Sequence, residues 1–341
     1  MKFLVIQTAF IGDVILATSV PEKLHEVYPG AKIDILVRKG NETLFTEHPF
    51  LNSVLVWDKK AGKYSDLFRL LKIIRKTNYD HVINLHRYAS SGLLTAFSGS
   101  KSRIGFDKNP FSFRLTKKVK HVIGNGTPSS VKTAEGKHET ERNHELIRDI
   151  TDAKPVKPKL YPTKTDRNTI ADLLKDHAPS KKYVCMAPAS VWFTKQLPKE
   201  KWMELIKEMN KKNYTVFFLG AESDKKLMDD ILSGSENGKA VNLAGKLSLL
   251  ASAALMSGAQ MNYVNDSAPM HLASAMNAPV TAFFCSTIPA FGFGPLSQRS
   301  VIAQTKEKLE CRPCGIHGKK HCPEQHFSCA MQIDVKLYTG I

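Results

Sequence analysis

Short apolar runs alternate with helix-like segments along the first half of the chain. Four runs have the length and bounding turns of buried strands, and they cover residues 2–7, 33–37, 53–57 and 80–85. Between the last two, apolar side chains recur at helical spacing, at Tyr64, Leu67, Phe68, Leu71 and Ile74. The pattern predicts a mostly parallel sheet whose strands alternate with helices.

A second alternating set begins at residue 183. Its predicted strands are 183–187, 215–219, 240–243, 261–264 and 279–284. Pro198 is well placed at a helix N-terminus, and the apolar residues that follow it share one helical face: Trp202, Leu205, Ile206 and Met209.

The two sets are separated by a segment rich in Lys, Asp and Pro, from Thr151 to Lys182, in which residues 169–176 could form one helix. We therefore predict an α/β protein with two doubly wound, Rossmann-like domains that face each other across a cleft. The expected boundaries are 1–155 for the first domain, 156–182 for a linker region and 183–341 for the second domain.

Size and composition fit this organisation. The chain has 341 residues and is 42% hydrophobic, which is ample for two cores of about 150 residues each. No run approaches the roughly 18 apolar residues that a membrane-spanning helix needs. The apolar stretch at Phe3–Ile6 is too short for a secretory signal, so it is interpreted as the first strand of a cytoplasmic protein.

The charge balance favours anionic partners. There are 49 Lys+Arg against 32 Asp+Glu, a formal net charge of +17. Residues 59–120 hold 15 of the basic side chains and only Asp66, Asp80 and Asp107 as acids. This stretch is either a solvated face or a docking surface for an anionic acceptor at a membrane. Nucleic acid is not expected, because the chain lacks an interleaved aromatic platform and helix-turn-helix or zinc-finger spacing.

Two acidic loops stand at equivalent places in the two halves. In each, an apolar strand-like run leads into a helix-like run: Phe3–Ile6 precedes Ile11–Asp13, and Met261–Val264 precedes Asn265–His271. Backbone N–H groups and the helix dipole converge where a strand end meets a helix start, so α/β proteins bind ligands there. The pair of loops predicts two substrates.

Ordered motifs over nearly the whole chain resemble glycosyltransferase family 9, the lipopolysaccharide heptosyltransferases with the GT-B fold. The matching pieces are Ile11–Asp13 with Thr18–Pro21, Ile104–Phe106, His138–Arg142, Lys195–Pro198, Asn242–Lys246, and Asn265–Ser267 with His271. The resemblance implies an ADP-heptose donor and an inner-core sugar of lipid A-linked oligosaccharide as acceptor.

Asp13 is the candidate general base. Transfer with inversion needs a carboxylate that takes the proton of the acceptor hydroxyl, and the resemblance assigns this role to Asp13. The alternative is that Asp13 only caps a helix that begins near Val14. Gly12 lets the backbone beside it approach the acceptor closely.

Lys195 is the candidate for stabilising the departing diphosphate. The chain has no Asp-x-Asp pair to clamp a divalent cation, so we expect catalysis without a metal and with positive charge from the protein. Ser190, Thr194 and the amides of Ala189–Val191 would add hydrogen-bond donors. The alternative is a surface lysine before a helix.

Further donor contacts are expected from the second acidic loop. Asp266 would repel a phosphate, so its expected partner is a sugar hydroxyl, which the resemblance also implies. Ser267 and the amides after it would bind the diphosphate, although helix capping explains both residues equally well. His271 is a secondary candidate, more typical of a packed histidine. Glu222, after a strand, would accept ribose hydroxyls or would simply be exposed.

The acceptor side is expected to engage carboxylate or phosphate groups. The candidates are His86, Arg87, Arg103, His138 and Arg142.

The six cysteines divide into two groups. Cys185 and Cys285 lie in strand-like runs and are expected to be buried thiols. The other four, Cys311, Cys314, Cys322 and Cys329, begin with a zinc-like Cys-x2-Cys pair, although the later spacing departs from common zinc patterns. They are either ligands of a structural zinc or free, packed thiols, and no cofactor is expected in catalysis.

Together these features predict an inverting, metal-independent glycosyltransferase that works at the inner face of the cytoplasmic membrane. The acceptor is expected on the first domain and the nucleotide-sugar on the second, with domain closure bringing Asp13 towards the anomeric carbon. Two alternatives stay open at this point. One is a nucleotide-sugar epimerase-like enzyme of the same fold, and the other is a non-catalytic protein that binds anionic surfaces or nucleic acid.

Overall fold

The computed structural model describes residues 1–60, 62–124, 136–152, 154–235 and 238–340. They divide into two compact units. The first unit ends at Tyr161, and the second continues from Pro162. The segment predicted as a linker, 156–182, crosses this point and contains helix α7 (Lys164–His177) of the second unit.

The first unit is built on one parallel sheet of six strands in the order β3-β2-β1-β4-β5-β6. The strands are β1 (Lys2–Gln7), β2 (Lys32–Arg38), β3 (Leu51–Trp57), β4 (His81–Asn84), β5 (Ser102–Phe106) and β6 (Lys117–Val119). The helices are α1 (Ile11–Ala17), α2 (Ser19–Val27), α3 (Lys63–Thr77), α4 (Ala89–Ala96) and α6 (Glu139–Ile147), with short 3-10 turns η1 (Glu42–Phe45) and η2 (Ser112–Arg114).

The second unit repeats this plan, with a parallel sheet in the order β12-β11-β10-β7-β8-β9. Its strands are β7 (Tyr183–Ala187), β8 (Thr215–Phe218), β9 (Ala240–Asn242), β10 (Asn262–Asn265), β11 (Val280–Phe283) and β12 (Ser300–Ala303). Besides α7, its helices are α8 (Lys199–Lys211), α9 (Lys225–Ser233), α10 (Leu249–Gly258), α11 (Ala268–Ala275) and α12 (Ser328–Met331), with η4 (Phe193–Lys195), η5 (Glu222–Asp224), η6 (Pro289–Phe291) and η7 (Val335–Tyr338).

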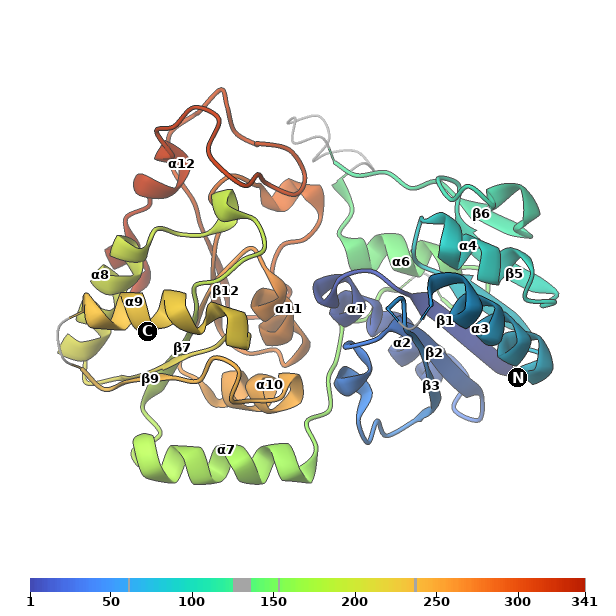
Figure 1. Cartoon of the computed structure of the whole chain (residues 1–341), viewed down its shortest axis with the longest axis horizontal. Helices are drawn as coiled ribbons and strands as arrows, with labels where there is room; N and C mark the ends of the chain where they lie inside the picture. Colours follow the sequence, from blue (N-terminus) through green and yellow to red (C-terminus); the bar gives the residue numbers. More distant parts are fainter. Residues whose placement is uncertain (61, 125–135, 153, 236–237, 341) are drawn as a thin grey trace. The chain divides into compact units, whose positions relative to one another are not determined.

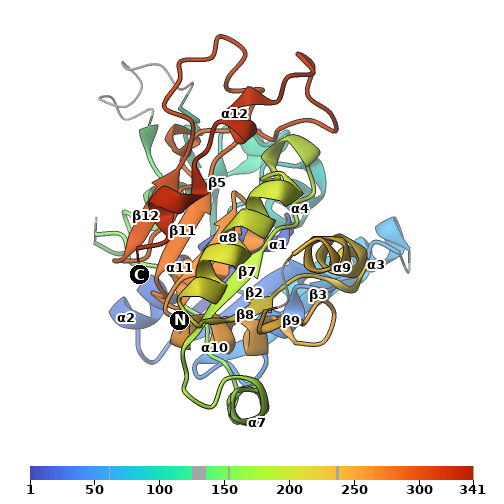
Figure 2. The same cartoon turned by 90° about the vertical axis from the view of Figure 1, so that its left-hand side faces the viewer.

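Helices cover both faces of each sheet. In the first unit α3 contacts α4, while α1 and α2 contact α6 (Figure 1). In the second, α8 contacts α9 and lies across one face of the sheet (Figure 2), while α10 contacts α7 and α11. The predicted apolar face of α8 is buried: Trp202, Leu205, Ile206 and Met209 pack into the core with strand residues such as Val184 and Phe218. No helix in the described part of the chain is both long and apolar enough to span a bilayer.

The prediction of two doubly wound sheets is confirmed, and the nine predicted strands are present with ends shifted by at most two residues. The expectation of a cleft between the domains stays a prediction. Strands β5, β6 and β12 were not predicted. β6 and β12 are edge strands of three and four residues, and β5 carries Arg103 and Gly105 in place of an apolar run.

Both sheets have the same topology, which creates one switch point in each unit. β1 lies between β2 and β4, and β7 lies between β8 and β10. From each of these central strands the chain first adds strands on one side of the sheet and then returns to add strands on the other side. In open α/β sheets ligands bind beyond the carboxyl ends of the strands at such a point. The two acidic loops lie at these two switch points, since Asp13 follows β1 and Asp266 follows β10.

Candidate active site

The first switch point brings together the loops after β1 and β4. Thr8, buried after β1, shares a hydrogen bond of 2.9 Å between its Oγ1 and Nδ1 of His86, which follows β4. Burial is the largest cause that lowers the pKa of His86 to about 4, and Lys59 and Arg87 add to it. His86 is therefore a neutral imidazole at physiological pH, and Arg87 beside it is exposed.

Asp13 is the third residue of α1, not its N-cap. The helix begins at Ile11, earlier than the start near Val14 that the capping alternative required, and its N-cap is Phe10 without a side-chain hydrogen bond. Asp13 is therefore not the N-cap of this helix. In the first turn, the carboxyl interacts instead with the backbone amides of Phe10 and of Asp13 itself.

The environment of Asp13 holds its proton unusually tightly. The pKa is raised from 3.8 to about 6, chiefly because the carboxyl is buried and secondly because Glu139 is negative; the two backbone amides and Arg87 oppose the shift. A carboxyl with a pKa near the operating pH is suited to general base catalysis.

Glu139 is a buried acid near Asp13 that the sequence did not single out, although it belongs to the His138–Arg142 motif. It is the first residue of α6 and only 6% exposed, and its Oε2 lies 2.7 Å from Nη2 of Arg142. Burial raises the pKa of Glu139 despite that ion pair. Glu139 in α6 therefore raises the pKa of Asp13 in α1, although the two helices are far apart in the sequence.

The acceptor candidates have different surroundings. His138 is the N-cap of α6 and accepts a hydrogen bond of 3.2 Å from the amide of Thr140. Arg142 is paired with Glu139. Arg103 lies opposite Val82, before the carboxyl end of the sheet, and its Nε donates to the carbonyl of Arg114 at 3.0 Å. The structure therefore places Arg87 close enough to influence both Asp13 and Glu139, and it pairs Arg142 with Glu139. His86 adjoins Arg87, and Arg103 lies apart from these acids.

At the second switch point Lys195 and Asp266 form an ion pair. Nζ of Lys195, at the end of η4, lies 2.7 Å from Oδ2 of Asp266, and the side chains are 15% and 8% exposed. Thr287, after β11, donates to the same oxygen at 2.6 Å. Neither this pairing nor Thr287 was predicted. Since Asp266 compensates the charge of Lys195, a bound anion must compete with the carboxylate for the lysine.

Buried polar side chains hold the loop that carries Lys195. Asn265 accepts from the amide of Leu197 at 3.0 Å and donates to the carbonyl of Pro188 at 2.6 Å. Oγ1 of Thr194 accepts from Oγ of Ser286 at 2.9 Å and from the amide of Lys319 at 2.8 Å. Thr194 is 1% exposed, so these contacts anchor it inside the fold.

The other donor candidates follow the ends of strands β7, β8 and β10 in the second unit. Ser267 is the N-cap of α11 but makes no side-chain capping bond; its Oγ donates to the carbonyl of Asn265 at 3.4 Å. His271 is buried in α11. The carbonyl of Ser190 accepts from Nε2 of Gln196 at 2.6 Å, and Glu222 is exposed at the start of η5.

Gly245 explains how Glu222 approaches the neighbouring loop. Gly245 has φ +73°, and a Cβ on it would stand 2.0 Å from Oε2 of Glu222. A larger residue at 245 would displace the carboxylate.

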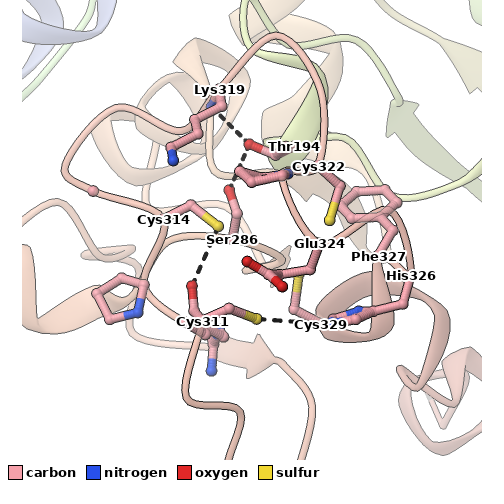
Figure 3. Close-up of a pocket in the computed structure, with 14 residues that line it drawn as sticks. Thr194, Ser286, Cys311, Cys314, Lys319, Cys322, Glu324, His326, Phe327 and Cys329 are labelled. Atoms are coloured by element: carbon pink, nitrogen blue, oxygen red, sulfur yellow. Dashed lines mark hydrogen bonds between the residues drawn. The ribbon is translucent and has the colours of Figure 1, made fainter.

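Four cysteines gather around one cavity of about 430 Å³ near this loop. As Figure 3 shows, the thiols of Cys311, Cys314, Cys322 and Cys329 line it. Cys185 and Cys285 are buried, as predicted, and all six cysteines are free. Within the described residues, no three His, Cys, Asp or Glu side chains are placed to hold a metal ion as they stand.

Comparisons with known proteins identify the family of the chain. The model of glycosyltransferase family 9 (heptosyltransferase) matches residues 67–326. Lipopolysaccharide heptosyltransferase 3 of Escherichia coli K12 is 29% identical over 292 residues, which are 82% of this chain and 81% of the relative. The structure of E. coli ADP-heptose LPS heptosyltransferase II aligns with a TM-score of 0.76 at 21% identity, over 92% of this chain and 96% of that one.

An E. coli heptosyltransferase solved with ADP-2-deoxy-2-fluoro heptose aligns with a TM-score of 0.69 at 19% identity, over 92% of this chain and 97% of that one. The structural likenesses show the GT-B fold, and the family model covers most of the sequence. The chain therefore belongs to glycosyltransferase family 9 and is a glycosyltransferase.

Proposed function

We propose that this protein transfers heptose from ADP-heptose to an inner-core sugar of lipopolysaccharide, with inversion at the anomeric carbon. The family and the names of the relatives support the sugar and the pathway. The related fold solved with an ADP-heptose analogue supports the donor. The observation that carries the proposal is a half-buried carboxyl of near-neutral pKa, Asp13, at the first switch point.

Asp13 acts as the general base. The acceptor hydroxyl oxygen forms a bond to the anomeric carbon while the bond to the diphosphate breaks, and the hydroxyl proton passes to Asp13. Above a pH of about 6 the carboxylate is ionised and able to take it. Such a base contributes about 10²–10⁴-fold in rate. Exposed Arg87 and neutral His86 flank the acceptor as charge and hydrogen-bond partners.

The second switch point binds the donor. ADP leaves with increased negative charge, and Lys195 with the amides after Ser267 stabilises it. Donor binding frees part of the Lys195 charge from Asp266, whose carboxylate then accepts a heptose hydroxyl. Glu222 accepts the ribose hydroxyls. No metal ion is needed in this scheme, because Lys195 supplies the charge that an Asp-x-Asp-bound cation would otherwise supply.

An exposed aromatic and basic patch on the first unit docks the enzyme on the anionic inner face of the cytoplasmic membrane. We define the Phe113 patch as Phe97, Phe111, Phe113 and Arg114. Phe97 and Phe113 are 41% and 73% exposed, and Arg114 lies over the ring of Phe97 at 4.8 Å. Aromatic rings settle at the lipid head-group level and basic residues attract anionic lipids. The patch lies within the basic 59–120 stretch.

The decisive experiment is transfer by the Asp13→Ala variant with ADP-heptose and a deacylated core oligosaccharide, followed by mass spectrometry. Transfer should fall by about 10²–10⁴-fold, while ADP binding measured by calorimetry stays unchanged. Asp149→Ala, which removes an exposed carboxylate of the same unit, is the matched control and should retain full activity. A normal rate in Asp13→Ala would remove Asp13 from the role.

Two further arms separate the alternatives. Incubation without acceptor tests for an epimerase, which would alter the donor alone. Replacing ADP-heptose by UDP-sugars tests the donor assignment, and transfer from a UDP-sugar alone would refute it.

A further inference from the structure

A threonine just after β11 reaches the ion pair of Lys195 and Asp266. Oδ2 of Asp266 lies 2.7 Å from Nζ of Lys195, and the same oxygen accepts a hydrogen bond of 2.6 Å from Oγ1 of Thr287. Thr287 is 1% exposed and Asp266 is 6% exposed, so the lysine and the threonine share a carboxylate that is largely withdrawn from water. A change in the position of Lys195 therefore leaves the carboxylate in contact with the Thr287 hydroxyl.

The backbone of Thr287 is held by hydrogen bonds to its own carbonyl and to those before it. Arg312 donates to the carbonyls of Cys285 and Thr287, at 2.7 and 2.8 Å. Between them, the carbonyl of Ser286 accepts from the amide of Cys314 at 2.9 Å. Because three consecutive carbonyls are bound in this way, the segment presents the Thr287 hydroxyl to Asp266 from a fixed backbone.

The same segment is joined to the loop of Lys195. Oγ of Ser286 donates to Oγ1 of Thr194 at 2.9 Å, a contact that is drawn as a dashed line in Figure 3. The amide of Ser286 also donates to the carbonyl of Thr194 at 3.2 Å, and Thr194 directly precedes Lys195. Ser286 thus holds the backbone beside the lysine, while Thr287 holds the carboxylate that the lysine contacts.

Binding of a diphosphate disturbs this arrangement, because it draws on the charge of Lys195. When the ammonium group turns to the diphosphate, the carboxylate of Asp266 loses its cation but stays buried. A buried charged group that is left without a hydrogen-bond partner costs free energy, and the cost is larger than for a neutral group. The hydroxyl of Thr287 supplies that partner, so it lowers the cost of releasing the lysine.

We infer that Thr287 is a positioning residue of the donor site, whose hydroxyl holds the Asp266 carboxylate in place when Lys195 leaves it for the diphosphate. The inference rests on the proposed role of Lys195 in binding the diphosphate. Thr287 acts through Asp266 and does not touch the donor in this assignment. ADP lacks the sugar whose hydroxyl would also donate to Asp266, so Thr287 matters more for the binding of ADP than for that of ADP-heptose.

Calorimetry of ADP binding to the full-length protein tests this inference without an assay of transfer. Thr287→Val removes the hydroxyl at nearly constant volume and should weaken ADP binding by about tenfold, the effect of losing a hydrogen bond to a charged group. Thr287→Ser keeps the hydroxyl and should bind ADP as the wild type does. The matched control is Thr281→Val, which alters a buried threonine of β11 whose hydroxyl contacts Sδ of Met261 at 3.4 Å, and it should also leave ADP affinity unchanged.

Two comparisons separate positioning from packing. In the Asp266→Ala background, Thr287→Val should leave ADP affinity unchanged, because the carboxylate through which Thr287 acts is absent. In the wild-type background, the loss of affinity caused by Thr287→Val should be smaller for ADP-heptose than for ADP, because a heptose hydroxyl gives Asp266 another donor. A threonine that served only to fill space would weaken both ligands equally, with or without Asp266.

Unchanged ADP affinity in Thr287→Val would overturn the inference. The same holds for a serine variant as weak as the valine variant, for an equal loss in the Asp266→Ala background, and for an equal loss with the two ligands. None of these results affects the proposed function as long as Lys195→Ala still weakens ADP binding. Unchanged ADP affinity in Lys195→Ala would instead refute the proposed role of the lysine, and the inference about Thr287 with it.

Discussion

Replacing Asp13 by asparagine should stabilise the protein at alkaline pH while it slows transfer by about 10²–10⁴-fold. The side chain keeps its shape and one oxygen acceptor but loses its charge. The folded state raises the pKa of Asp13 from 3.8 to about 6. An acid with a raised folded pKa binds its proton more tightly when folded, so ionisation destabilises the folded state from pH 3.8 upward, and the cost is complete above pH 6.

The size of this cost follows from the shift. A difference of about 2.2 pKa units, between 3.8 and about 6, corresponds to about 3 kcal/mol at pH 8, as an upper bound for a half-buried group. In a unit of this size, each kcal/mol moves the melting temperature by about 2–4 °C. We therefore expect Asp13→Asn to melt up to about 10 °C higher at pH 8 and within about 2 °C of the wild type near pH 4.

Scanning calorimetry of the intact chain between pH 4 and pH 8 measures this difference. The control is Asp149→Asn in the same unit: Lys117 lowers the pKa of this exposed carboxyl, so removing its charge should not stabilise the fold. If Asp13→Asn melts lower than the wild type at pH 8, the carboxylate is a stabilising group, and the electrostatic argument for its role as a base fails.

Three further outcomes follow from the same contacts. The rate of transfer should fall below a pH of about 6 as Asp13 becomes protonated. Glu139→Gln should move this fall to lower pH, because it removes the negative charge that raises the pKa of Asp13. An unchanged pH–rate profile in Glu139→Gln would contradict the coupling between the two acids. Lys195→Ala should weaken ADP binding in calorimetry, whereas Lys211→Ala, a surface lysine of the same unit paired with Glu208, should not. Phe113→Ser should reduce co-sedimentation with anionic vesicles but not with neutral ones, and equal binding to both would refute the docking surface.

The sequence predicted the central strands because they are apolar runs, and it found Asp13 and Asp266 because each follows such a strand. It did not predict that Lys195 and Asp266 form an ion pair. Their contact depends on β7 and β10 being neighbours, and the hydrophobic pattern of a strand does not specify which strand lies beside it. For the same reason the effect of Glu139 on Asp13 was not predicted, since it joins α1 to α6.

The two units show how one topology can support the two different roles that we propose for its aspartates. Each sheet has the same strand order and an aspartate at its switch point. In the second unit the ammonium group of Lys195 lies 2.7 Å from Asp266 and compensates its charge, which keeps that carboxylate as a binding group. In the first unit the strongest neighbouring influence on Asp13 after burial is another acid, Glu139, so its carboxyl retains affinity for a proton. The difference that we propose between base and binding group therefore comes from the charges that α6 and η4 place beside each strand end, and the fold alone does not determine it.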